Sequence, residues 1–387
     1  MTRRVVVTSL GVLTSNANNQ LEFTRALRDG RPGISRITAF PTDKYRVHIG
    51  GEVHNIPATP FEIDRTTHLA LLAAEETLGQ TGLTEKQLSN CPLFFGTLSG
   101  PAISLEEYVL SGRTKNFLPA KLRLATTVKE VAAKYALHGK VRTISNACAA
   151  STVAIGLAFD YLHNDEGDIA LAGGSDSFNL TTFSGFHALR SLDPVACRPF
   201  DKNRQGLVAS EGAGFILLEE YNHALRRGAP ILGEILGYGL SSDAYHDTSP
   251  EPTGKGALMA MRLALASAQI SPDQIGYVNA HGTGTLQNDR AEAMAINSLF
   301  TKVPVSSTKS QIGHAMGAAG VIEAIATLIA LKNGFLPPTI NFQEADPDCP
   351  LDVIPNQARE QICRYALSNN FGFGGTNASL VLKRFDD

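Results

Sequence analysis

The chain has 387 residues, a formal net charge of −3 and an apolar fraction of 43%. This length suits two or three domains, or one large core built in two parts. The slightly acidic balance argues against a general role on nucleic acids or membrane surfaces. The five cysteines are scattered without paired spacing, so the sequence indicates neither disulfides nor a zinc site and fits a reducing cytoplasm. No long apolar run lies near the N-terminus, and Glu323 interrupts the run over 317–331, so we expect neither a signal peptide nor a membrane span.

Strand and helix signals alternate along the first half. Residues 4–8 predict a buried strand that ends in a turn at Ser9-Leu10-Gly11, and residues 20–28 predict a helix. The further predictions are an irregular segment over 30–60, helices over 66–80 and 124–136, and strands over 92–97, 168–173 and 212–218. The pattern leaves residues 103–120 and 175–192 undetermined.

The second half of the chain repeats this pattern. Its predicted elements are a strand and turn at 231–242, a helix at 256–267, strands at 277–280 and 303–306, and a helix at 317–332. The last strand and helix repeat the arrangement found over 141–162. Strands that alternate with helices predict a mostly parallel sheet covered by helices. We therefore expect a duplicated, layered α/β fold, with one half at 1–228 and the other at 229–387.

One cysteine lies where a predicted strand gives way to a predicted helix. Residues 141–144 predict the strand, and Ala147 to Leu162 predict an apolar helix, so Cys148 is expected near the helix N-terminus. There the unpaired N–H groups and the positive end of the helix dipole favour a thiolate. A single cysteine among alanines is also typical of a small buried core residue, so this segment alone does not decide between the two roles.

Three segments in the second half contain residues suited to chemistry. Asn279-Ala280-His281-Gly282-Thr283-Gly284-Thr285 places a histidine in a loop of small and hydroxyl residues directly after a strand. Within 306–320, Lys309 and His314 precede a helix at the position that corresponds to Cys148 in the repeat. Residues 369–377 form a glycine-rich turn whose N–H groups suit a developing oxyanion, or simply a tight turn before the last strand.

Together, these segments resemble one enzyme family. The motifs are Asn146-Ala147-Cys148-Ala149-Ala150-Ser151, the His281 loop, Lys309-Ser310-Gln311-Ile312-Gly313-His314 and Phe371-Gly372-Phe373-Gly374-Gly375-Thr376-Asn377. In this order and spacing they are similar to motifs of the chain-elongating β-ketoacyl-[acyl carrier protein] synthases. Segments 197–201, 211–214 and 241–246 are also similar to family segments. The resemblance covers essentially the whole chain and implies the thiolase-like fold, a duplicated αβαβα layered arrangement that forms dimers.

The resemblance implies a decarboxylative Claisen condensation with an acyl carrier protein as partner. Cys148 would hold the acyl chain as a thioester, while His281 and His314 promote decarboxylation of the malonyl unit and stabilise its enolate. The backbone N–H groups of Cys148 and Phe373 would form the oxyanion hole, and Phe373 matches the family's gate. The supporting positions are Lys309 and Glu323, which orient the histidine segment, Asp289, a structural acid, Thr283, Thr285 and Phe371, which contact the substrate arm, and Arg198, Lys202 and Arg204, which dock the acidic carrier protein. No cofactor or metal is expected, because the carrier protein brings the phosphopantetheine.

Related classes differ at the same positions. Thiolases have a second catalytic cysteine in the C-terminal glycine-rich turn, where this chain has none. Synthases primed by acyl-CoA have Asn in place of His314. The non-catalytic chain-length partner of polyketide ketosynthases shares the fold but lacks the nucleophile, so Cys148 argues against it. The resemblance therefore implies an active condensing enzyme.

The pathway stays open between two alternatives. One is a fatty-acid elongation enzyme that acts as a homodimer, and the other is a polyketide or polyene ketosynthase paired with a cysteine-less chain-length partner. Segments 98–140 and 177–195, which in the family help to line the acyl pocket and the dimer interface, are shorter than in typical fatty-acid members. The helix start at 64–68 also has fewer basic residues than the family's carrier-binding patch.

Overall fold

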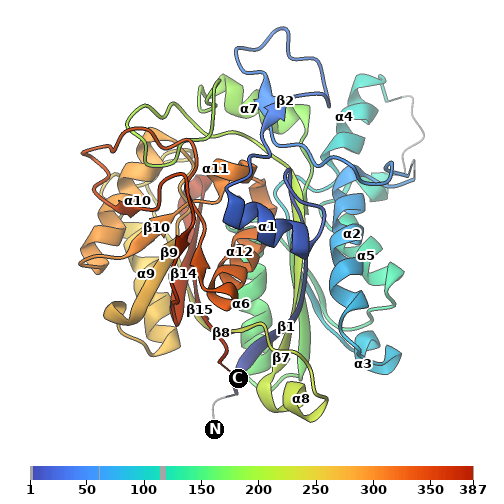
Figure 1. The fold of residues 1–387 in the computed structure, drawn as a ribbon. Coiled ribbons are helices and arrows are strands. Elements are labelled where there is room, and N and C mark those ends of the chain that lie inside the picture. Colours follow the sequence, from blue (N-terminus) through green and yellow to red (C-terminus); the bar gives the residue numbers. More distant parts are fainter. Residues whose placement is uncertain (1–2, 61, 114–118, 387) are drawn as a thin grey trace.

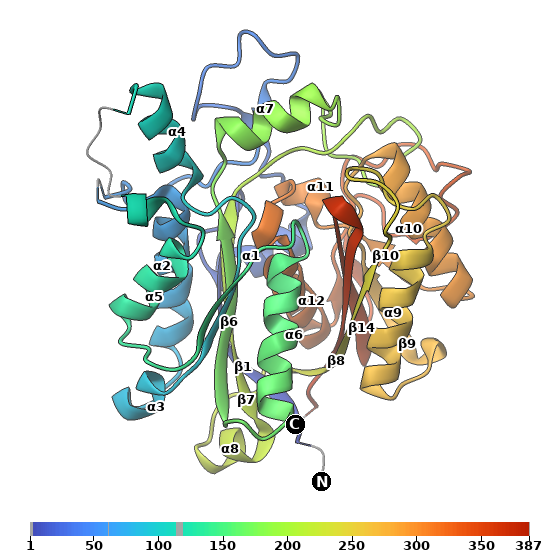
Figure 2. The ribbon, with the colours of Figure 1, turned by 180° about the vertical axis from the view of Figure 1, so that it is seen from behind.

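The computed structural model describes residues 3–60, 62–113 and 119–386, and these residues form five layers (Figure 1). Figure 2 shows the two outer helical layers, the two groups of strands inside them and the two central helices. The outer helices are α2 (Arg65–Gly79) and α5 (Thr126–Lys134) on one side, and α9 (Lys255–Ala268) and α10 (Leu286–Leu299) on the other. The central helices are α6 (Ala150–His163) and α12 (Ala319–Asn333).

The strands occur as two sets with the same order. The first set runs β1 (Val5–Leu13), β7 (Gly212–Glu220), β6 (Ile169–Asp176), β4 (Leu93–Gly96) and β5 (Val141–Ile144). The second set runs β8 (Gly233–Ser242), β15 (Thr376–Lys383), β14 (Tyr365–Gly372), β9 (Ile275–Asn279) and β10 (Pro304–Ser306), and β12 (Asp352–Val353) pairs with β10 at the edge. In each set the first two pairings are antiparallel and the last two are parallel.

This repeated order confirms the predicted duplicated, layered α/β fold. The two sets are joined where β1 pairs with β8 over Val5–Val7, so the strands form one continuous sheet around the central helices. The division of the chain near residue 228 stays a prediction.

The central helices are mostly apolar and mostly buried. Every residue of α12 from Ala319 to Leu331 is buried, as expected for a helix enclosed by two sheets. The stretch Met316–Asn333 is long and apolar enough to cross a membrane, but 89% of it is buried inside the fold, which is typical of a core helix. Gly320 lets helix α6 approach α12 closely. A Cβ at this position would lie 2.1 Å from Oγ1 of Thr152.

The remaining helices and short strands cover the ends of these layers. They are α1 (Gln20–Asp29), β2 (Ser35–Arg36), β3 (Ile49–Gly50), α3 (Glu85–Ser89), α4 (Ala102–Leu110), η1 (Pro119–Leu122), α7 (Leu180–Ala188), α8 (Tyr221–Arg226), η2 (Pro272–Gln274), α11 (Lys309–Ile312), η3 (Met316–Ala318), β11 (Phe335–Leu336), β13 (Arg359–Glu360) and η4 (Phe373–Gly375). The undetermined stretches therefore contain α4, the start of η1 and α7, while residues 114–118 lie outside the described residues.

The predicted turn at Ser9-Leu10-Gly11 is wrong. Strand β1 continues through it to Leu13, with a β-bulge between Val7 and Ser9. Gly11 is needed for a different reason, because a Cβ there would lie 2.3 Å from the Ala73 carbonyl oxygen of α2. The glycine thus marks the close approach of a helix to a strand rather than a turn.

The same error occurs in the repeat, for the same reason. The predicted turn at the end of 231–242 lies within β8. A Cβ on Gly239 would lie 2.2 Å from the Ala260 carbonyl oxygen of α9. Both halves therefore use a glycine in the first strand to admit the backbone of an outer helix.

Candidate active site

Cys148 lies at the turn between β5 and α6. Helix α6 begins at Ala150 rather than at the predicted Ala147, because Ala147 has a left-handed conformation with φ of 55° that does not continue a right-handed helix. The turn places Cys148 just before the helix, where it lines a cavity and is 6% exposed.

The thiol of Cys148 contacts His314. The Sγ atom lies 3.0 Å from Nε2 of His314. Burial raises the pKa of the Cys148 thiol to about 12, and the positive charge of Lys309 opposes this shift. Burial therefore opposes the thiolate that the position near the helix N-terminus was predicted to favour. At this distance a neutral thiol can donate its hydrogen to Nε2 of His314.

A lysine and a glutamate fix the second histidine. His281 follows β9, and its Nδ1 atom lies 3.2 Å from Nζ of Lys309. Lys309 is fully buried and forms an ion pair with Glu323 of α12. Because an ammonium group only donates, Nδ1 of His281 accepts and the ring hydrogen lies on Nε2. The two imidazole rings have centroids 5.3 Å apart and are inclined by 85°.

Both imidazoles are neutral. Burial, reinforced by the charge of Lys309, holds the pKa of His281 and of His314 well below the ordinary value of 6.5. Each ring therefore has one hydrogen near neutral pH. In His281 the contact with Lys309 places this hydrogen on Nε2. In His314, Nδ1 has no hydrogen-bond partner in the described part of the chain. The cavity holds one histidine with a fixed tautomer and one without.

The glycine-rich turn lies directly against the cysteine. A Cβ on Gly372 would lie 2.9 Å from Cβ of Ala147 and 3.1 Å from the backbone nitrogen of Cys148. No other residue type fits at this position without a shift of the backbone. The preceding Phe371 is 7% exposed, and its ring centroid lies 5.7 Å from that of His281.

The reactive groups share a cavity of about 160 Å³. Thr283 and Thr285 line its wall, with their hydroxyl oxygens 2.9 Å apart. Phe373 is 38% exposed, and its ring centroid lies 5.5 Å from that of Phe186 on α7, which also lines the cavity. The structure thus brings the predicted cysteine, both histidines and the predicted substrate-contacting residues into one cavity, while Lys309 lies behind His281 and does not line it.

Two carboxylates of α10 hold the His281 loop. Glu292 accepts hydrogen bonds from the N–H groups of His281 and Gly282, both at 2.8 Å. Asp289, the predicted structural acid, accepts from Gly284 at 3.1 Å and from Phe200 at 2.8 Å. Burial raises the pKa of Glu292 to about 7. The sequence analysis missed Glu292, although its spacing of three residues from Asp289 on one helix face is a usable signal.

A buried carboxylate of the first half holds the His314 segment. Asp176, at the end of β6, accepts hydrogen bonds from Gly317 at 2.8 Å, from Leu98 at 2.7 Å and from Ser99 at 2.9 Å. Glu211, just before β7, is a second buried carboxylate of this half, and it forms an ion pair with Arg65. Both were missed as site residues, because their partners lie far away in the sequence.

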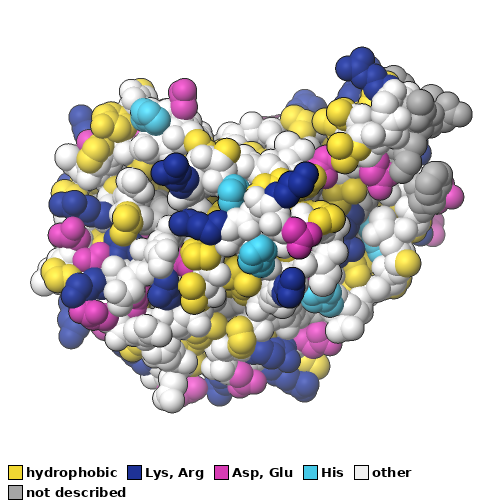
Figure 3. Space-filling model, turned by 90° about the horizontal axis from the view of Figure 1, so that it is seen from above, with side chains coloured by type: hydrophobic (Ala, Val, Ile, Leu, Met, Phe, Trp, Pro, Cys, Tyr) yellow, Lys and Arg dark blue, Asp and Glu magenta, His cyan; other side chains and the backbone are white. Residues whose placement is uncertain are grey.

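The predicted carrier-docking residues need correction. Arg198 is buried and bonded to Asp193, and Arg204 is buried between Asp289 and Asp346. Their guanidinium groups form ion pairs inside the protein and are not available to a partner. Lys202 is exposed and paired with Glu344. Figure 3 shows Lys and Arg side chains on the face seen from above, spread among apolar, histidine and acidic ones.

Comparisons with known proteins cover the chain from end to end. Family models match for the beta-ketoacyl synthase N-terminal domain over residues 2–224 and for the beta-ketoacyl synthase C-terminal domain over residues 232–343. The chain is 37% identical to 3-oxoacyl-[acyl-carrier-protein] synthase 2 of Synechocystis sp., over 99% of this chain and 98% of the relative. It is 40% identical to nodulation protein E of Rhizobium leguminosarum bv. trifolii, over 99% of this chain and 100% of the relative.

Solved structures show the same arrangement. The ishigamide ketosynthase/chain length factor matches with a TM-score of 0.95 and 37% identity over the full length of both chains. A type II polyketide synthase acyl-carrier protein in complex with its ketosynthase, AntDE:AntF, matches with a TM-score of 0.90 and 31% identity, also over both full chains.

Proposed function

Because the chain belongs to the β-ketoacyl synthase family, we propose that it condenses a Cys148-bound acyl group with malonyl-[acyl carrier protein] to give carbon dioxide and a β-ketoacyl-[acyl carrier protein]. The contact between Cys148 Sγ and His314 Nε2 at 3.0 Å, in a cavity that His281 also lines, carries this proposal. One nucleophile beside two neutral imidazoles fits a reaction that needs a covalent acyl holder and donors for an enolate.

Acyl loading uses the thiol and His314. Cys148 attacks the thioester carbonyl of the acyl-carrier protein while Nε2 of His314 accepts the thiol hydrogen. The backbone N–H groups of Cys148 and Phe373 hold the oxyanion, a role supported by the contact of Gly372 with the Cys148 backbone. The carbon–sulfur bond to the carrier breaks, and the departing thiolate takes the proton from His314. The acyl group remains on Cys148.

Decarboxylation uses both imidazoles as hydrogen-bond donors. Loss of carbon dioxide from the malonyl unit leaves its bonding electrons as an enolate, whose oxygen accepts hydrogen bonds from Nε2 of His281 and Nε2 of His314. His281 presents its N–H because Lys309 occupies Nδ1. After loading, the remaining ring hydrogen of His314 is on Nδ1, which no group holds among the described residues, so proton exchange with water can move the hydrogen to Nε2 and give the ring a donor. The enolate carbon attacks the Cys148 thioester, and the released thiolate takes up one proton to restore the thiol.

The partner of this reaction is an acyl carrier protein, in line with the names of the similar synthases. The carrier brings the phosphopantetheine arm, whose amide groups the hydroxyls of Thr283 and Thr285 can bind from the cavity wall. The protein itself is expected to hold neither a metal nor a cofactor. The cytoplasmic location expected from the unpaired cysteines stays a prediction.

The working unit is a dimer of related chains. Strand β5 lies at one edge of the sheet, and Val109 and Leu110 of α4 are 55% and 77% exposed, which suits a surface that another chain covers. A homodimer would serve fatty-acid elongation, and a heterodimer with a cysteine-less partner would serve polyketide or polyene synthesis. The match to a structure named as a ketosynthase/chain length factor favours the heterodimer.

The proposal is tested with defined carrier proteins. The purified chain, alone and co-expressed with a cysteine-less relative, is incubated with acyl-carrier and then malonyl-carrier protein. Mass spectrometry should find the acyl group on the peptide that contains Cys148, followed by a carrier-bound product longer by two carbons. Product formation with no acyl group on Cys148 would contradict the proposed function, and full activity of the chain alone would contradict the heterodimer.

A further inference from the structure

The backbone of His314 is held by a segment of the other half. Its N–H donates to the Val208 carbonyl at 2.8 Å, and its carbonyl accepts from Ser210 at 2.9 Å. On the other side of the same segment, Gly51 donates and accepts one hydrogen bond each, at 3.0 and 2.9 Å. Residues 208–211 are therefore the middle strand of a short backbone ladder, and His314 lies on one edge of it.

This ladder has little room to shift. A Cβ on Gly51 would lie 2.5 Å from Cβ of Ser210, and one on Gly313, which has φ of 77°, would lie 2.9 Å from the same atom. Both glycines thus bring backbone directly against Ser210. Any movement of 208–211 is passed to the backbone of His314, because close packing leaves no gap to absorb it.

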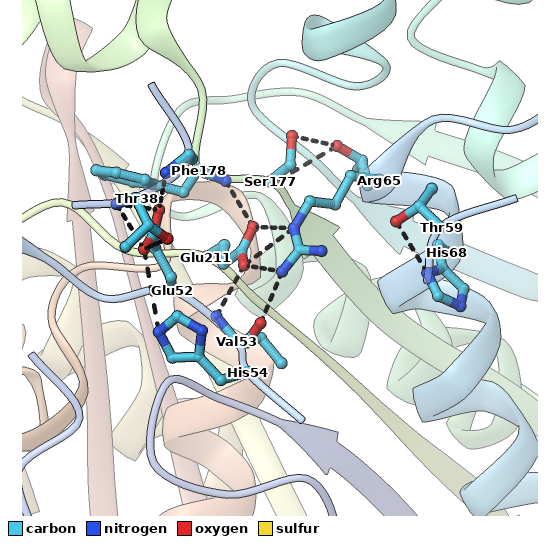
Figure 4. A network of polar contacts seen from close by, with 12 residues as sticks. Thr38, Glu52, Val53, His54, Thr59, Arg65, His68, Ser177, Phe178 and Glu211 are labelled. Carbon is cyan, nitrogen blue, oxygen red and sulfur yellow. Dashed lines mark hydrogen bonds and ion pairs between the residues drawn. The ribbon is translucent and has the colours of Figure 1, made fainter. Parts of the chain in front are cut away.

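Glu211 anchors the end of the segment. Its carboxylate is buried and accepts hydrogen bonds from the N–H groups of Val53 at 2.8 Å and Phe178 at 3.0 Å. Arg65, at the start of α2, donates from Nε at 2.9 Å and from a terminal nitrogen, and that nitrogen also donates to the Val53 carbonyl at 2.7 Å. Figure 4 shows Glu211 at the centre of these contacts, with Arg65 reaching it from α2.

We propose that Arg65 and Glu211 are positioning residues for His314. The forked ion pair fixes residues 208–211, and this segment in turn fixes the imidazole against the thiol of Cys148. Neither side chain lines the reaction cavity, so they act through the backbone ladder and not on the substrate. The inference rests on the proposed role of His314 in decarboxylation.

The opposite end of the same strand supplies a matched control. Glu219, near the end of β7, is also buried and forms an ion pair with Arg227, which donates from Nε at 2.8 Å. Eight residues of strand place it roughly 25 Å from Glu211. The two pairs therefore share burial and chemistry, and only the Arg65 pair adjoins the ladder that holds His314.

The experiment measures carbon dioxide release from malonyl-carrier protein in a Cys148→Gln background, which isolates decarboxylation from acyl transfer. We expect Arg65→Lys to lower kcat about tenfold with little change in KM, because a single ammonium keeps the charge but loses the fork. With Cys148 intact, the same variant should be alkylated more slowly by iodoacetamide, since the thiol loses its acceptor. Arg227→Lys should lose similar thermal stability but keep its kcat.

The outcomes separate this inference from the proposed function. If His314→Ala decarboxylates normally, the proposed function fails. If His314→Ala is inactive but the kcat of Arg65→Lys stays within about two-fold of the parent, only the positioning role is overturned. The same holds if His314→Ala is inactive and the kcat of Arg227→Lys falls as far as that of Arg65→Lys. If Arg65→Lys does not fold, Glu211→Gln replaces it, because the amide oxygen keeps an acceptor for Val53 or Phe178, and its kcat is judged by the same limits.

Discussion

The two histidines of the cavity are held in opposite ways. The ring of His281 is bound by Lys309, and its backbone N–H is bound by Glu292. The backbone of His314 is fixed just as firmly, but its ring contacts the Cys148 thiol on one side and has no partner for Nδ1 within the described residues. The protein thus fixes the position of both rings and the tautomer of only one.

This difference follows the chemistry that each ring performs. His281 donates to the enolate and needs one tautomer throughout the cycle. His314 first accepts the thiol hydrogen and later donates from the same nitrogen, so a bound Nδ1 would oppose one of the two steps. The freedom of the His314 ring is therefore part of the proposed mechanism, and the variants below test it.

The largest effect is expected from removing the nucleophile. Cys148→Gln should abolish condensation but keep or raise the rate of malonyl-carrier decarboxylation, because an amide imitates the acylated cysteine and gives up no hydrogen to His314. Mass spectrometry of the enzyme and carbon dioxide release measure the two activities. A folded Cys148→Gln protein that releases no carbon dioxide would show that the histidines do not act independently of the sulfur.

Removing each histidine should distinguish their roles. His314→Ala should lower decarboxylation by about 10²- to 10³-fold, the effect of losing one preorganised donor, while still allowing some acyl transfer to Cys148. His281→Ala should also lower decarboxylation, but less completely, because His314 still polarises the carbonyl. Both rates come from carbon dioxide release at saturating malonyl-carrier protein. Normal decarboxylation by His314→Ala contradicts the assignment.

Releasing the tautomer of His281 should have a smaller effect. Lys309→Met removes the donor to Nδ1 and leaves Glu323 buried without its partner, at a cost of about 3 kcal/mol in unfolding free energy. The double variant Lys309→Met/Glu323→Leu should regain most of that stability but not the decarboxylation rate, which we expect to stay about tenfold low. Urea unfolding and carbon dioxide release measure the two quantities. Recovery of both together would mean that the ion pair serves stability alone.

The reactive residues could be predicted from the sequence because they stand in short motifs at the ends of repeated units. Cys148 and His314 occupy equivalent junctions in the two halves, and a duplicated fold brings such junctions to the same end of the central helices. Local signals explain little beyond that. The φ of 55° at Ala147, which delays the helix, is unusual for an alanine, and no local pattern in the sequence indicates it.

The carboxylates that hold these loops could not be predicted in the same way. Asp176 binds the N–H of Gly317, 141 residues away, and a sequence pattern does not pair such positions. Arg198 and Arg204 show the converse case, because arginines in an irregular segment suggest an exposed surface. Arg204 pairs with Asp346, which only the fold brings near, whereas Arg198 pairs with Asp193, five residues away in the sequence.

The smallest predicted effect is on the pH dependence of stability. In the unfolded chain His281 and His314 bind protons near pH 6.5, whereas the folded protein holds their pKa well below that value, chiefly through burial. The unfolded state therefore binds more protons as the pH falls below about 6.5, so the stability due to the neutral rings is complete above that pH and is lost below it. Between about pH 7 and pH 5.5 the free energy of unfolding should fall by about 1 kcal/mol for each histidine.

Urea unfolding of a His281→Asn/His314→Asn variant tests this. Its free energy of unfolding should change less with pH than that of the parent, by about 2 kcal/mol over that range. An equal slope in the two proteins would mean that the rings become charged inside the fold, which contradicts two neutral donors at the enolate.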